Sequence, residues 1–199
     1  HAGSFDLSYL RHIPNLMIMA PRNEPELQNM LATAMAHEGP VALRYPRGLG
    51  EGAPLADCPE ILPVGQGELL RDGSDGVIVA LGSRVNPALE AARLFHAETG
   101  RDVAVFNARF VKPLPEEQLL ALASTQPCML VVEENVLQGG FGSAVLELLA
   151  DRDALAKLRF KRLGVPDIFV EHGSQKELRA RLGLNRDGIL QALHSLSGG

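Results

Sequence analysis

The sequence predicts an α/β fold in which helices cover both faces of a largely parallel sheet. Short, continuous apolar runs such as Leu16–Ala20 and Gly76–Leu81 are typical of strands that are buried on both faces. Amphipathic helical patterns separate these runs, and alternating strands and helices imply right-handed crossovers between parallel strands. Glycine and proline are spread along the 199 residues, which suits a globular fold with many short turns.

The chain opens with a helix and a strand. Apolar residues at helical spacing predict a short amphipathic helix from Phe5 to Ile13, and Pro14 ends it. The run Leu16–Ala20 then predicts a strand that is buried on both faces and stopped by Pro21.

A second helix and a second strand follow directly. The side chain of Asn23 can cap a helix whose apolar spacing continues to Gly39, a residue type that often ends helices. Val41–Tyr45 is expected to form a strand that Pro46 ends. These elements make only half of an α/β domain, so we expect the missing strands to lie upstream of His1 and the chain to be a fragment.

Residues 49–63 separate two parts of the chain. They contain several glycines and prolines without any periodicity, the composition of a linker. The sequence therefore predicts an amino-terminal part over residues 1–48 and a larger α/β domain over residues 64–199.

The larger part shows five strand patterns and five helix patterns. The expected strands are Gly67–Arg71, Gly76–Leu81, Val103–Phe106, Met129–Glu133 and a segment near Leu158–Leu163. The expected helices run from about Asn86 to Thr99 and over Glu116–Ala123, follow the turn at Gly139–Gly142, and start near Ser174 and Asn185. This order favours a parallel sheet covered on both faces.

Composition excludes several classes of protein. A net charge of −5 and an isoelectric point near 5.7 argue against a nucleic-acid surface, which needs a concentrated basic face. The apolar runs are too short to cross a bilayer, so no membrane partner is expected. Cys58 and Cys128 lie far apart and form no metal-binding spacing, which favours a cytoplasmic protein with free thiols over one with a single disulfide.

Arg47 is the strongest candidate for ligand binding. It directly follows a strand that Pro46 ends, and ligands of open α/β sheets gather outside the carboxyl ends of the strands. An arginine at that position can present two parallel N–H donors to a phosphate or a carboxylate. Arg44 still lies within the strand, which favours a structural role. The alternative for Arg47 is a surface residue paired with Glu51.

Other polar residues support weaker hypotheses. His1 has an imidazole suited to proton transfer or to hydrogen bonding with a substrate oxygen, but a lone histidine is more often a surface or packed residue. The stretch Gly139–Ser143 resembles a phosphate-cradling turn, yet it lacks a P-loop lysine, and a tight strand-to-helix turn is favoured. Glu133 and Glu134 are adjacent in a strand and should point to opposite faces, so they form a poor acid–base pair. His172 could reach a neighbouring site, but a place in the core or in a loop is favoured.

Several stretches together resemble the 1-deoxy-D-xylulose-5-phosphate synthase family. They are HAGSFDLSYLRHIPNLMIMAP, GPVALRYPRG and LGVPDIFVEHGSQKELRARLGL, supported by RFVKPLPEE and VVEENVLQGGFGS. The resemblance covers essentially the whole chain in order. It implies a transferase of the transketolase superfamily in which residues 1–48 form the second half of the thiamine-diphosphate pyrimidine-binding domain and residues 64–199 form the C-terminal domain.

The resemblance also implies a reaction and a set of partners. Members of the family decarboxylate pyruvate and join its two-carbon unit to D-glyceraldehyde 3-phosphate, giving 1-deoxy-D-xylulose 5-phosphate and CO₂ for isoprenoid and thiamine biosynthesis. They use thiamine diphosphate and Mg²⁺ and work as cytoplasmic homodimers. The family's motifs for the diphosphate and Mg²⁺, and its activating glutamate, would lie upstream of His1. The resemblance therefore implies that this chain needs the remainder of the enzyme and is inactive alone.

Two residues match functional positions of the family. His1 matches the histidine of a D-G-x-T-H stretch, whose side chain lies near the reactive carbon of the cofactor and contacts the substrate. Arg47 matches the second arginine of R-Y-P-R-G, which helps to hold the phosphate of the aldehyde. Ala2 departs from the polar residue that many members have beside that histidine. Two alternatives stay open: another superfamily member, such as a 2-oxoacid dehydrogenase β subunit or a transketolase, and a non-catalytic assembly module.

Overall fold

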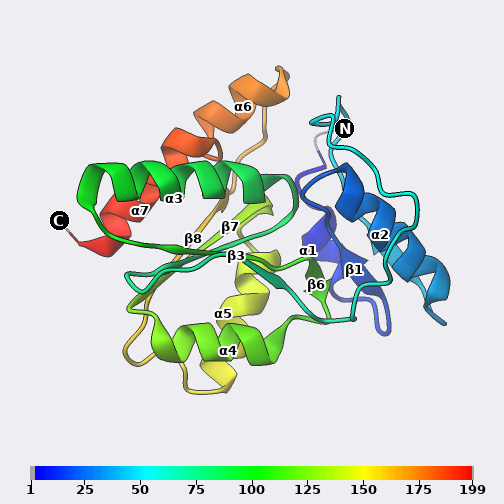
Figure 1. Cartoon of the computed structure of the whole chain (residues 1–199), viewed down its shortest axis with the longest axis horizontal. Coiled ribbons are helices and arrows are strands. Elements are labelled where there is room, and N and C mark those ends of the chain that lie inside the picture. Colours follow the sequence, from blue (N-terminus) through cyan, green and yellow to red (C-terminus); the bar gives the residue numbers. More distant parts are fainter. Residues whose placement is uncertain (1–2, 199) are drawn as a thin grey trace.

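Two sheets organise the chain in the computed structural model, which describes residues 3–198 (Figure 1). The larger sheet has the strand order β3 (Glu68–Arg71), β5 (Ala104–Asn107), β4 (Val77–Ala80), β7 (Cys128–Val136) and β8 (Arg159–Val165). The smaller sheet has the order β2 (Val41–Leu43), β1 (Met17–Met19) and β6 (Phe110–Lys112). All the strands that the sequence predicts are present within a few residues of their expected bounds.

The larger sheet confirms the predicted α/β class. Strands β4, β5, β7 and β8 are parallel, whereas the edge strand β3 is antiparallel to β5. Helices α3 (Val85–Thr99) and α7 (Arg186–Ser197) cover one face, and α4 (Glu116–Thr125) and α5 (Phe141–Asp151) cover the other (Figure 1). Alternate residues of β4 enter the two cores, so its continuous apolar run reflects burial on both faces.

The amino-terminal elements also follow the sequence pattern. They are α1 (Asp6–Leu10), β1, α2 (Glu24–Ala36) and β2. The side chain of Asn23 accepts a hydrogen bond from the backbone N–H of Glu26 at 3.1 Å, which confirms the predicted cap. Strand β1 is buried throughout and pairs in parallel with β2.

Strand β6 was not predicted from the sequence, and it joins the two parts of the chain. It pairs in antiparallel fashion with β1, so one sheet contains strands from residues 1–48 and from residues 64–199. Phe110 of β6 is fully buried together with Met17 and Met19 of β1. The amino-terminal segment is therefore held to the larger part by a shared sheet and a shared core.

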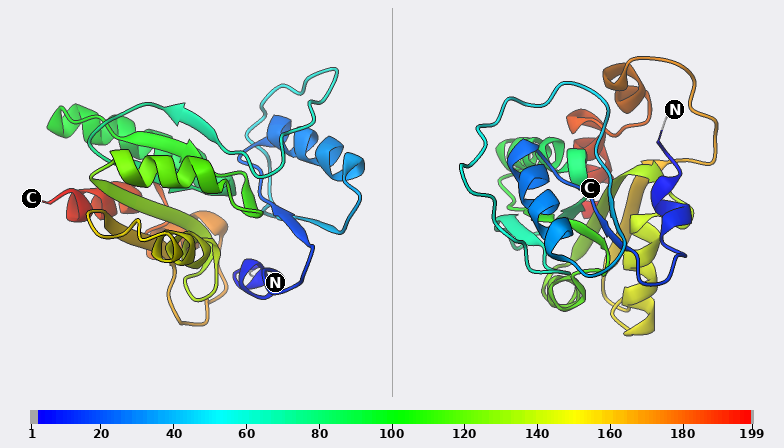
Figure 2. Two further views of the ribbon diagram at one scale, coloured as in Figure 1. Left: turned by 90° about the horizontal axis from the view of Figure 1, so that it is seen from below. Right: turned by 90° about the vertical axis from the view of Figure 1, so that its right-hand side faces the viewer.

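The segment between β2 and β3 has no helix or strand and passes along α2 (Figure 2). The backbone N–H of Leu62 donates to Thr33 of α2 at 2.8 Å, and that of Glu60 donates to Asn29 at 2.9 Å. Leu62 is itself buried. These contacts attach the predicted linker to the helix that precedes it.

The carboxy-terminal helices begin at the predicted caps. Ser174 and Glu177 form a capping box at the start of α6 (Gln175–Arg181), and Asn185 accepts from the backbone N–H of Gly188 at the start of α7. A short 3₁₀ turn, η1 (Gly82–Arg84), follows β4 and was not predicted.

The thiols are free, as expected from the cysteine spacing. Cys58 is exposed and Cys128 is buried, and neither is part of a disulfide. Within residues 3–198, none of the helices is long and apolar enough to span a membrane.

Candidate functional site

A cleft of about 630 Å³ lies where several strands of both sheets end. The segments that follow the carboxyl ends of β1, β2 and β4 line it, and α6 closes one side. Its lining includes the polar residues Tyr45, Arg47, Ser83, Arg84, Gln175 and Arg179. This is the edge at which open α/β sheets bind ligands. Its lining contains both arginines and the acidic residues Glu24 and Glu51.

Arg47 lies in this cleft, in the segment that follows β2. Its backbone carbonyl accepts a hydrogen bond from the side-chain amide of Gln175 at 2.5 Å. Within the described part of the chain, its guanidinium takes part in none of the ion pairs, and Glu51 accepts a hydrogen bond from Asn86 instead. The alternative of an Arg47–Glu51 pair is thus not observed, and the guanidinium is available to an anion.

Arg44 has the structural role that its position in the strand pattern predicts. Its guanidinium donates to the backbone carbonyls of Gly3, at 2.8 Å, and of Glu134, and it forms an ion pair with Asp6 at 3.3 Å. These contacts fasten the segment before α1 to the end of β7.

A cluster of charges around Glu134 forms one wall of the cleft. Its carboxylate accepts from Arg179 Nε at 3.0 and 3.1 Å and from Ser83 Oγ at 3.0 Å, and it forms an ion pair with Arg84 Nε at 3.2 Å. Arg84 is only 3% exposed, and burial lowers its pKa to about 10 although the Glu134 charge opposes this. Burial tends to raise the pKa of Glu134, but the two guanidinium groups outweigh it and hold that pKa below its ordinary value.

Glu133 points to the other face of the sheet, as the strand geometry predicts. Its carboxylate accepts from the backbone N–H groups of Phe141 and Gly142, both at 2.7 Å, at the start of α5. A Cβ atom on Gly140 would lie 2.3 Å from Glu133 Oε2, so the glycine is needed for this close approach. The donors that a phosphate would use in Gly139–Ser143 are therefore already occupied by an internal carboxylate, and the favoured interpretation as a tight turn is confirmed.

Glu133 should make the stability of the chain depend on pH. Burial raises its pKa to about 7 from the ordinary 4.5, although the Gly142 and Phe141 N–H groups oppose this. Between pH 4.5 and about 7, the carboxyl of Glu133 keeps its proton in the native state and loses it in the unfolded state. The contribution of this group to the free energy of unfolding is therefore complete below pH 4.5 and is lost as the pH rises through about 7. We expect Glu133→Gln to remove this loss, which is on the order of 3 kcal/mol.

The measurement is urea unfolding of the wild type and of Glu133→Gln between pH 4.5 and 8. As the pH rises, the free energy of unfolding of Glu133→Gln should increase relative to that of the wild type. Parallel curves for the two proteins would contradict the raised pKa of Glu133.

The two histidine candidates differ in what the structure describes. His1 lies outside the described residues, and its role stays a prediction. His172 is exposed in the loop between β8 and α6, as expected. Arg84, Gln175 and Arg179 line the cleft and were not predicted from the sequence. Arg84 follows β4, so the tendency of ligands to bind after strand ends could have indicated it. No sequence pattern indicates that Arg84 lies near α6.

Two observations concern the Mg²⁺ and the diphosphate group of the cofactor that the resemblance implies. In residues 3–198, no three His, Cys, Asp or Glu side chains are grouped so that they could hold a metal ion. The glycine-rich turn before α5, the one that resembles a phosphate cradle, is filled by Glu133. Neither Mg²⁺ nor a diphosphate group is assigned to a site here.

Comparison with known families agrees with both parts of the fold. Residues 65–189 match the family described as "Transketolase, C-terminal domain", and residues 1–52 match "Transketolase, pyrimidine binding domain". The chain therefore belongs to the transketolase family. Within that family, the chain is similar to curated 1-deoxy-D-xylulose-5-phosphate synthases, as the sequence motifs indicate.

Three relatives illustrate the extent of this similarity. The synthase of Nitratidesulfovibrio vulgaris (strain DP4) is 56% identical over 98% of this chain, and that of Oleidesulfovibrio alaskensis is 56% identical over 100%. Synthase 1 of Geobacter sulfurreducens is 56% identical over 96%. The chain spans only 31%, 31% and 30% of the lengths of these relatives.

Solved structures share the fold. A chain of a split-gene transketolase, determined as an inactive β4 tetramer, matches with a TM-score of 0.81 and 28% identity over 96% of this chain and 61% of its own. Transketolase from Campylobacter jejuni matches with a TM-score of 0.69 and 19% identity over 95% of this chain and 27% of its own. The second likeness shows the fold alone.

Proposed function

We propose that this chain is the carboxy-terminal part of a 1-deoxy-D-xylulose-5-phosphate synthase. The complete enzyme would decarboxylate pyruvate and condense the two-carbon unit with D-glyceraldehyde 3-phosphate, giving 1-deoxy-D-xylulose 5-phosphate and CO₂. The observation that carries this proposal is the 56% identity to such synthases across nearly the whole chain. The available guanidinium in the strand-end cleft supports it.

Arg47 is proposed to bind the phosphate of the aldehyde substrate. Its guanidinium is exposed in the cleft and, unlike those of Arg84 and Arg179, which pair with Glu134, it is open to an anionic group. Two parallel N–H donors suit a phosphate. Because the phosphate is remote from the reacting carbonyl, its binding energy can orient the aldehyde for the condensation.

His1 is proposed to contact the substrate near the reacting carbon, as the family motif implies. In the intact enzyme, we expect His1→Ala to lower turnover by roughly a hundredfold or more, the usual effect of losing a positioned acid–base or hydrogen-bonding group. Cofactor binding should be largely unchanged. Steady-state kinetics together with a titration of thiamine diphosphate checks both statements, and an unaffected rate would remove His1 from the site.

Thiamine diphosphate and Mg²⁺ are proposed to bind mainly to residues outside this chain. The cofactor would supply the decarboxylation chemistry. The partners are then the rest of the same enzyme and a second copy in a homodimer, and the location is the cytoplasm. This chain alone should be inactive. The split-gene transketolase chain, solved as an inactive tetramer, is consistent with that expectation.

Product analysis separates this proposal from its alternatives. Among these enzymes, only the synthase both releases CO₂ from pyruvate and makes a 1-deoxy sugar phosphate. A transketolase exchanges two-carbon units between sugar phosphates, and an assembly module makes no product. The 28% identity to a transketolase, against 56% to the synthases, favours the synthase.

A further inference from the structure

Helix α6 is short and lies at the surface beside the cleft. It has only seven residues, and none of them is buried. Short helices are marginal without tertiary packing, because few backbone bonds offset the cost of nucleation. Leu182, which follows the helix, packs against the core, and polar contacts of Gln175 and Arg179 hold the helix itself over the cleft.

The first contact joins α6 to the proposed phosphate-binding segment. Gln175, the first residue of the helix, donates its side-chain N–H to the backbone carbonyl of Arg47 at 2.5 Å. A Cβ atom on the next residue, Gly48, would lie 3.6 Å from Gln175 Oε1, so the amide packs closely along this backbone. The two partners are 128 positions apart in sequence and come from different parts of the chain.

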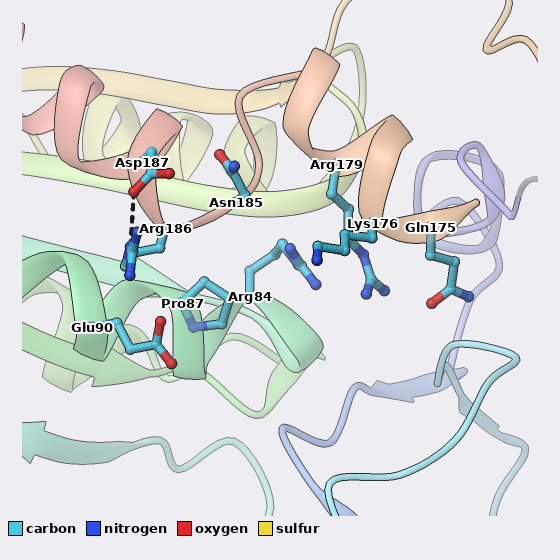
Figure 3. A pocket seen from close by; sticks show the side chains of 9 residues that line it. All are labelled: Arg84, Pro87, Glu90, Gln175, Lys176, Arg179, Asn185, Arg186 and Asp187. Atoms are coloured by element: carbon cyan, nitrogen blue, oxygen red, sulfur yellow. Dashed lines mark hydrogen bonds and ion pairs between the residues drawn. The ribbon is translucent and has the colours of Figure 1, made fainter. Parts of the chain in front are cut away.

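The second contact joins α6 to the larger sheet. Arg179, one turn further along, binds both carboxylate oxygens of Glu134 in β7. Glu134 is shared with Arg84, whose Nη1 donates to the backbone carbonyl of Leu184 at 2.6 Å between α6 and α7. Figure 3 shows Gln175 and Arg179 projecting from α6, with Arg84 reaching toward the same space from the other side.

We infer that α6 is a positioning element for substrate binding. Arg179 and Glu134 fix the helix to the sheet, and Gln175 then holds the backbone of Arg47 so that its guanidinium faces the phosphate site. Gln175 acts through Arg47 and does not itself bind the phosphate. The expected effect on enzyme kinetics rests on the proposed function. The contact between Gln175 and Arg47 can be tested without measuring activity.

The activity-independent test uses trypsin on this chain. Trypsin cuts after arginine and needs access to the carbonyl that Gln175 binds, so the cleavage rate follows the population in which this contact is open. We expect Gln175→Ala to speed cleavage after Arg47 by about fivefold, the effect of losing one neutral hydrogen bond. Lys176→Ala, a neighbouring exposed change on the same helix, should leave that rate unchanged, as should cleavage after Arg152 in every variant.

The kinetic test uses the intact enzyme. Gln175→Ala should raise the KM for glyceraldehyde 3-phosphate by about fivefold and leave the KM for pyruvate and kcat unchanged. In an Arg47→Ala background, the same change should have no further effect, because the two residues act as a unit. A structural defect of the fold would alter both KM values and kcat together.

Two results would overturn the inference. One is cleavage after Arg47 that Gln175→Ala leaves unchanged, which would show that the contact does not hold the segment. The other is an aldehyde KM effect that adds fully to that of Arg47→Ala, which would show that Gln175 acts independently. An intact wild-type enzyme that makes no 1-deoxy sugar phosphate would instead remove the proposed function, and the trypsin comparison would still decide the role of α6.

Discussion

In the intact enzyme, Arg47→Ala is expected to raise the KM for glyceraldehyde 3-phosphate by roughly a hundredfold, about 3 kcal/mol, while the KM for pyruvate changes little. The reason is the loss of charge-assisted hydrogen bonds to a phosphate that only the aldehyde carries. The side chain of Arg47 takes part in none of the ion pairs described between residues 3 and 198, so removing it breaks no ion pair within that part of the chain.

Steady-state kinetics with each substrate varied in turn makes this measurement. Arg93→Ala is the matched control, since Arg93 is an exposed arginine on α3 outside the cleft. Arg47→Lys keeps the charge but loses the paired donors, and we expect an intermediate KM. Equal, small effects of Arg47→Ala on both substrates would remove Arg47 from the phosphate site.

The second large effect concerns the charge cluster at the cleft wall. Glu134→Ala should lower the free energy of unfolding of this chain by about 3–5 kcal/mol. Arg84 is only 3% exposed, and the variant removes the carboxylate that pairs with it. The same change also breaks the ion pair of Arg179. Burying an uncompensated cation is costly because it cannot be solvated by water.

Urea unfolding at neutral pH measures this loss. Arg152→Ala is the control, because it breaks an exposed ion pair with Glu116 and should cost at most about 1 kcal/mol. Similar midpoints for Glu134→Ala and the wild type would mean that the cluster does not stabilise the fold. Glu134→Gln, which keeps the shape, should be less damaging than the alanine variant.

Most of the secondary structure could be predicted because its signals are local. Asn23, Ser174 and Asn185 cap helices where their side chains indicate, and the apolar runs coincide with buried strands. Strand β6 was missed because it has three residues and no periodicity of its own. Its partner, β1, lies about ninety positions away, and only tertiary packing brings the two together.

The candidate site was less predictable, for the same reason. Arg47 could be singled out because a strand end is visible in the sequence. Its contact with Gln175 joins residues 128 positions apart, and no local pattern indicates it. In the glycine-rich turn Gly139–Ser143, by contrast, the sequence suggests a binding site that the structure does not support. Its sequence fits a phosphate site, and only the structure shows that Glu133 occupies the donors.

The shared sheet and α6 together explain how two parts of the chain build one cleft. Strand β6 holds the amino-terminal elements against the larger part, and α6 reaches back from the larger part to the segment after β2. The cleft walls therefore come from both sides of residues 49–63. A substrate bound there would contact both parts at once.

The central claim is tested most directly by product analysis of the intact enzyme that contains this chain. The enzyme would be incubated with ¹³C-labelled pyruvate, glyceraldehyde 3-phosphate, thiamine diphosphate and Mg²⁺, and the products followed by NMR and CO₂ release. The proposal predicts labelled 1-deoxy-D-xylulose 5-phosphate and CO₂ in equal amounts. No reaction by a fully loaded enzyme, or two-carbon transfer without CO₂ once a ketose phosphate is added as donor, would contradict it.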